Sequence, residues 1–128
     1  MIERIPAELE LLKFHYPGLQ YRDDDHWLLI AGFPTCSEAW TQTAADVAFK
    51  FPDLPGQPPY GFWVRPGLSL KSGTGVQNYS YPVETPFGPG FGQFSWAPDE
   101  WRPASDVRLG SNMLRWVESF KVRLAEGS

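Results

Sequence analysis

The side chains most often used for nucleophilic and metal chemistry are scarce in this chain of 128 residues, which contains one cysteine and two histidines. His15 and His26 are far apart and have no companion cysteines, so their spacing predicts no metal site. Cys36 follows a Gly-Phe-Pro-Thr turn, and the local pattern places no histidine beside it to activate the thiol. We therefore expect Cys36 to be a small turn residue. No Ser-His-Asp catalytic set is recognisable either.

Two stretches rich in proline or glycine match parts of known binding motifs. Gly-Pro-Gly-Phe-Gly at residues 88–92 fits neither a dinucleotide fingerprint, which needs a helix directly after it, nor a phosphate-binding loop, which needs Gly-Lys-Ser/Thr. Pro52, Pro55 and Pro58 form two overlapping Pro-x-x-Pro patterns of the kind found in polyproline II ligands. Hydrophobic segments flank them closely, so we interpret these prolines as the ends of strands.

Length and composition predict one globular domain over residues 1–128. Hydrophobic residues make up 42% and aromatic residues 16% of the chain, which is typical of a packed core. The formal net charge of −4 argues against nucleic-acid binding, which usually requires a basic face. The chain has a lone cysteine, an acidic N-terminal segment and no apolar run approaching about 18 residues. These features predict a cytoplasmic protein with no membrane span.

Two helices are predicted from apolar residues that recur every three or four positions. The first starts near Ile5, with Pro6 in its first turn, and stops at Pro17-Gly18. The second covers residues 105–127 and begins with a cap at Ser105 or Asp106. Its apolar stripe consists of Leu109, Met113, Trp116, Phe120 and Leu124.

Three strands are predicted at residues 26–34, 45–51 and 60–66, and their short connections indicate an antiparallel meander. Glycines and prolines interrupt every periodicity in residues 66–100. We therefore expect a long irregular segment there, of a kind that often carries function. The order of the elements predicts an α+β fold with its helices on one face of the sheet.

The ordered pieces together resemble the ubiquitin-conjugating (E2) family. In that family a strand containing Trp ends in Gly and Pro, a second strand ends in Phe-Pro, a proline pair precedes the third strand, and a Trp-x-Pro precedes a helix. The corresponding residues here are Trp27, Gly32-Phe33-Pro34, Phe51-Pro52, Pro58-Pro59 and Trp101-Arg102-Pro103. The resemblance covers roughly residues 5–124 and implies a UBC-like fold with a four-stranded antiparallel meander.

Within the family, the chain is similar to a divergent bacterial group known as prokaryotic E2 family E. In that group a Gln and a Ser precede Trp-x-Pro-x-x-Asp, as Gln93 and Ser95 do here. The resemblance implies an E1-like activating enzyme, a ubiquitin-like protein and a JAB-type peptidase of the same operon as partners. It implies no cofactor, since the E1 partner would consume the ATP.

The chain departs from the family at the catalytic position. Counted back from Trp101, the usual position of the E2 cysteine falls on Gln93, and the histidine of the His-Pro-Asn motif is missing. The resemblance therefore implies Ser95 as a nucleophile that carries the ubiquitin-like protein as an oxyester, with Ser72 and Ser80 as weaker candidates. Asn78 stands for the motif's asparagine, which donates a hydrogen bond to the oxyanion; otherwise it caps a turn.

Two alternatives remain open at this stage. The domain could be a catalytically inactive E2 variant that binds the ubiquitin-like protein or the E1 partner. It could also be a small binding module unrelated to conjugation, which uses the glycine-rich residues 66–100 to hold a partner. An open antiparallel sheet with the last helix packed behind it is expected for the E2 reading, whereas a closed barrel would exclude it.

Overall fold

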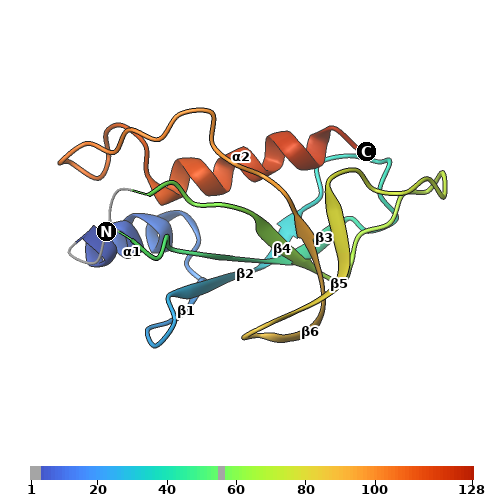
Figure 1. The fold of residues 1–128 in the computed structure, drawn as a ribbon, viewed down its shortest axis with the longest axis horizontal. Coiled ribbons are helices and arrows are strands. Elements are labelled where there is room, and N and C mark those ends of the chain that lie inside the picture. Colours follow the sequence, from blue (N-terminus) through green and yellow to red (C-terminus); the bar gives the residue numbers. More distant parts are fainter. Residues whose placement is uncertain (1–3, 55–56) are drawn as a thin grey trace.

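The computed structural model describes residues 4–54 and 57–128. Over these residues the chain forms two helices and six strands (Figure 1). In chain order they are α1 (Ile5–His15), β1 (Gln20–Arg22), β2 (Trp27–Pro34), β3 (Ala44–Lys50), β4 (Phe62–Arg65), β5 (Tyr79–Thr85), β6 (Gly88–Phe94) and α2 (Met113–Ala125). The α+β class predicted from the sequence is confirmed. Neither helix of this described part is long and apolar enough to cross a membrane.

The strands form one antiparallel sheet in the order β1-β2-β3-β4-β6-β5. The predicted four-stranded meander was therefore wrong. The short strand β1 was missed, and the segment expected to be irregular supplies the β5–β6 hairpin, which places β6 against β4. Glycine and proline occupy several positions of this hairpin, and Gly88 and Gly90 have positive φ angles of 119° and 84°. Such residues hide the alternation by which a strand is recognised.

Both helices pack on one face of the sheet, as predicted. The main core joins Ile5 and Leu12 of α1 to the stripe of α2 and to inward-facing strand residues such as Val47 and Phe49. The opposite face carries a smaller cluster in which Leu29, Ala48, Trp63 and Phe91 are buried. The guanidinium of Arg65 lies 4.6 Å from the Phe91 ring on this face. The sheet thus buries apolar side chains on both faces, but helices pack on only one of them.

The helix α2 begins later than predicted. Gly110 has a φ of 64°, a left-handed conformation that interrupts a right-handed helix, and Leu109 is 59% exposed. Asn112 is the cap instead of Ser105 or Asp106, because its side-chain oxygen accepts a hydrogen bond from the Arg115 N–H at 2.7 Å. The nine residues between Pro103 and Met113 are therefore not helical, and Leu109 does not belong to the helix stripe.

A carboxylate from α1 completes the start of α2. The Oε1 atom of Glu8 accepts a hydrogen bond from the Met113 N–H at 3.1 Å, and Glu8 is fully buried. Burial raises the pKa of the Glu8 carboxyl above its ordinary value, although the Met113 N–H and Arg4 favour the charged form. The Glu8 side chain thus links α1 to the first residue of α2.

Pro52, Pro58 and Pro59 lie outside β3 and β4, next to the ends of these strands, in agreement with the interpretation from the sequence. Phe51-Pro52 directly follows β3, and Pro58-Pro59 precedes β4 with Pro59 buried. A proline cannot donate to a ladder, so these positions suit it. Pro55, which both Pro-x-x-Pro patterns require, lies outside the described residues.

Candidate functional site

Two of the three residues expected at the site meet at the open end of the β5–β6 hairpin. Asn78 directly precedes β5 and Ser95 directly follows β6. The Ser95 N–H donates a hydrogen bond to the Asn78 carbonyl at 2.9 Å, and both side chains are exposed. Asn78 has a φ of 53°, in the left-handed region that Asn tolerates better than most residues. We call this pair the Asn78–Ser95 junction.

A buried arginine of α2 anchors the junction. The Nη2 atom of Arg123 donates to the carbonyl of Gln77, the residue before Asn78, at 2.7 Å. Its guanidinium lies 4.7 Å from the Phe94 ring, and the side chain is only 3% exposed. Burial lowers the pKa of Arg123, and Glu126 opposes this shift. Arg123 thus links the Gln77 backbone and the Phe94 ring, which flank the junction, to the last helix.

Gln93, the third residue expected at the site, lies inside the sheet. It pairs with Trp63 of β4 and with Ser80 of β5, and it is partly buried. A Cβ atom placed on Gly61 would lie 3.6 Å from the Gln93 side-chain nitrogen. The position where the E2 cysteine was expected is therefore part of a central strand, and Gln93 does not join the exposed junction.

Within residues 4–54 and 57–128, the junction presents a hydroxyl but no base bonded to it. Among the described residues, no side chain forms a hydrogen bond with the Ser95 hydroxyl. Glu84 and Asp99 are the nearest acids before and after Ser95 in the sequence; both are exposed, and neither is bonded to it. A serine is a weak nucleophile unless a base or a polarising group activates it. On its own, the junction can position an attacking oxygen and offer the Asn78 amide as a donor.

The structure places Cys36 in the exposed loop after β2, in agreement with the small turn residue expected from the sequence. Cys36 is an exposed turn residue with a φ of 64°, and its thiol lies 3.4 Å from the Pro34 carbonyl. Desolvation raises the pKa of this thiol, and the Lys121 ammonium opposes the shift, so the thiolate is not favoured. Within residues 4–54 and 57–128, no three His, Cys, Asp or Glu side chains gather as a metal site would require.

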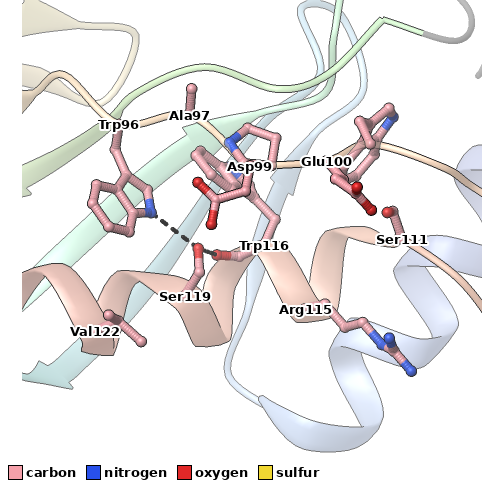
Figure 2. Close-up of a pocket in the computed structure, with 11 residues that line it drawn as sticks. Trp96, Ala97, Asp99, Glu100, Ser111, Arg115, Trp116, Ser119 and Val122 are labelled. Atoms are coloured by element: carbon pink, nitrogen blue, oxygen red, sulfur yellow. Dashed lines mark hydrogen bonds between the residues drawn. The ribbon is translucent and has the colours of Figure 1, made fainter.

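Sequence reasoning missed a pocket between the segment 96–101 and α2 (Figure 2). This cavity of about 400 Å³ is lined by three indoles, two acids and residues of α2: Trp96, Ala97, Pro98, Asp99, Glu100, Trp101, Ser111, Arg115, Trp116, Ser119 and Val122. We call it the tryptophan pocket. Figure 2 shows the Trp96 indole directed at Ser119, whose hydroxyl accepts its N–H at 3.0 Å and donates to the Trp116 carbonyl at 2.5 Å.

Two indole N–H groups of this pocket have no acceptor. The Nε1 atoms of Trp101 and Trp116 are buried without a hydrogen-bond partner in the part of the chain that the structure describes. Buried donors are nearly always paired, so each such exception requires an explanation. The only sequence signal was the presence of three tryptophans in residues 96–116. The resemblance accounted for Trp101 as part of Trp-x-Pro, and periodicity accounted for Trp116 as part of the helix stripe.

No protein-family model matches this chain, and no curated protein or solved structure matches it either.

Proposed function

We propose that this chain is an E2-like component of a bacterial ubiquitin-like protein conjugation pathway. It accepts the C-terminus of a ubiquitin-like protein from an E1-like enzyme and holds it as an oxyester on Ser95. The observation that carries this proposal is the backbone hydrogen bond that brings Ser95 and Asn78 together. The resemblance implies Ser95 as the nucleophile and Asn78 as the oxyanion donor, and the two residues are seventeen positions apart in the chain.

The arrangement of elements supports a UBC-like scaffold. One helix precedes an open antiparallel sheet, and a second helix follows Trp101-Arg102-Pro103 and packs on the same face of the sheet. The sheet is not a closed barrel, since β1 and β5 are its edges. The β5–β6 hairpin is an addition to the expected pattern, because it occupies residues for which that pattern has an irregular segment.

The atoms and charges of the proposed transfer step balance without a cofactor. The Ser95 oxygen attacks the carbonyl carbon of the thioester that joins the ubiquitin-like C-terminus to the E1 cysteine. A carbon–oxygen bond forms, the carbon–sulfur bond breaks, and the serine proton leaves with the departing thiolate. The exposed Asn78 amide donates to the oxyanion of the tetrahedral intermediate. The E1 partner has to complete the site, because the junction contains no base.

That missing base also favours a second candidate, a non-catalytic adaptor. An exposed serine without an activating partner reacts slowly, whereas binding a ubiquitin-like protein or its E1 requires only a complementary surface. In this role the chain recruits the same partners, including the JAB-type peptidase, and forms no covalent bond.

The test is to incubate the chain with its E1-like enzyme, the ubiquitin-like protein and ATP, and to look for an adduct. The carrier predicts an adduct that resists thiol, is lost in mild base and is absent from Ser95→Ala. Ser95→Cys should convert it into a thiol-sensitive adduct. Ser80→Ala tests the weaker candidate nucleophile, an exposed serine on β5 that pairs with Gln93, and it should leave the adduct unchanged if Ser95 is the nucleophile.

The outcomes separate the candidates. An adduct that survives Ser95→Ala and disappears in Cys36→Ser contradicts the oxyester. Tight binding of the ubiquitin-like protein or E1 without any adduct supports the adaptor. Absence of both an adduct and binding contradicts the E2-like proposal in either form.

A further inference from the structure

The tryptophan pocket combines aromatic walls with an acidic rim. Trp116 is 2% exposed, and Trp96 and Trp101 are partly buried. Asp99 and Glu100 are exposed at the mouth, in the segment that joins Trp96 to Trp101. Indole faces attract cations more strongly than other aromatic rings do, and nearby carboxylates add to this attraction. The volume of about 400 Å³ lies within the range of small-ligand sites.

We propose that this pocket binds a lysine or arginine side chain presented by a peptide segment of a partner protein. The alkyl stem of the side chain packs on the indoles, and its charged group lies near Asp99 and Glu100. This site differs from the Asn78–Ser95 junction, and the proposal does not depend on the carrier function.

The charges around the pocket favour a cationic occupant. The ion pair from Glu100 to Arg102 is long, at 3.8 Å, and both side chains are more than two thirds exposed, so a ligand can replace it. Arg115 also lines the pocket, but Figure 2 shows its guanidinium directed away from Asp99. The formal net charge of −4 on the whole chain acts in the same direction over longer distances.

The unpaired indole donors indicate a peptide rather than a free amine. The N–H groups of Trp101 and Trp116 need acceptors, and the carbonyls that flank a basic residue in a peptide are acceptors of the required kind. Both nitrogens are buried, so the proposal requires the groups that cover them to shift before a carbonyl can reach them. The carbonyls of the bound peptide thus accept hydrogen bonds from the two indole N–H groups.

The test measures binding of acetyl-Gly-Lys-Gly-amide, and of its arginine counterpart, to the full chain. Binding is followed by the six indole N–H signals in a proton–nitrogen NMR spectrum. We expect saturable shifts of the Trp96, Trp101 and Trp116 signals. A norleucine peptide, which keeps the stem and lacks the charge, should bind about tenfold more weakly.

Charge variants provide the control. Asp99→Asn with Glu100→Gln should weaken the lysine peptide about tenfold, while Asp23→Asn with Glu38→Gln removes the same charge away from the pocket and should change little. Equal weakening by both pairs contradicts a local site. The proposal is also overturned if the norleucine peptide binds as tightly, if a glutamate peptide binds better, or if the three indole signals do not move. None of these results depends on adduct formation at Ser95.

Discussion

The Asn78–Ser95 junction and the tryptophan pocket contain consecutive residues, Ser95 and Trp96, but they are built from different interactions. The junction is held by its own backbone hydrogen bond and by the Arg123 side chain, and both of its candidate side chains are exposed. The pocket is held by side chains, with one indole bonded to Ser119 and two others buried without an acceptor among the described residues. The junction therefore requires a partner to supply reactivity, whereas the pocket already carries groups that recognise a ligand.

One helix supports both regions through different faces and turns. Arg123 of α2 holds the backbone beside Asn78, and Trp116 and Ser119 of the same helix line the pocket. Phe120 lies between these positions in the sequence and packs into the main core. Substitutions along this helix can therefore disturb both regions together or each one separately.

Phe120→Ala has the largest expected effect, because it removes the support that the two regions share. The ring is fully buried, stacks on Phe62 with centroids 4.2 Å apart and contacts Trp116 edge to face at 5.1 Å. Loss of such a side chain costs about 3–5 kcal/mol of unfolding free energy. Urea unfolding measures the loss, and hydrogen exchange should show both regions loosened together. A loss below about 1 kcal/mol would contradict the central role of this ring.

Arg123→Met is expected to affect the junction and leave the pocket intact. Methionine fills part of the same space but removes the charged donor to the carbonyls of Gln77 and Ser128. We expect a loss of about 1–3 kcal/mol and faster exchange of the Ser95 amide. The Trp96 indole signal should not move. If it shifts as much as the Ser95 amide does, the two regions are one cooperative unit and the comparison fails.

The helices and the three central strands could be predicted because their apolar periodicity is strong. Val47 and Phe49 face the main core as the alternation indicated, and Met113, Trp116 and Phe120 lie on the predicted stripe. The start of α2 could not be read from that stripe, since Leu109 matches its spacing. The left-handed Gly110 and the Asn112 cap override the pattern locally.

The two candidate regions differ in how far the sequence could predict them. Ser95 and Asn78 could be named from residue types and their order, but only the hairpin shows that they are adjacent. The tryptophan pocket could not be predicted, because its walls come from the segment 96–101 and from a helix that starts at Met113. Periodicity accounts for Trp116 as a core residue and does not report that its N–H lacks an acceptor.

Ser119→Ala is expected to affect the pocket and leave the junction intact. It removes the hydroxyl that accepts the Trp96 N–H, so a third indole loses its partner. We expect a loss of about 1 kcal/mol, a shifted Trp96 indole signal and weaker binding of the lysine peptide. Ser72→Ala is the control, because Ser72 is exposed in the loop before the junction and bonds only locally to Thr74. A faster Ser95 amide exchange in Ser119→Ala would show that the pocket supports the junction after all.

Two substitutions at Asn78 separate its backbone role from its side-chain role, and Asn78→Gly has the smallest expected effect on stability of all these variants. The φ of 53° disfavours Asn78→Ala by about 1–2 kcal/mol, while Asn78→Gly adopts the same backbone with little strain. If Asn78 only shapes the turn, Asn78→Gly should keep the rate of adduct formation and Asn78→Ala should lower it. If the amide donates to an oxyanion, both variants should lose about 100-fold or more of the rate. The comparison of rates therefore decides whether the junction does any chemistry beyond presenting Ser95.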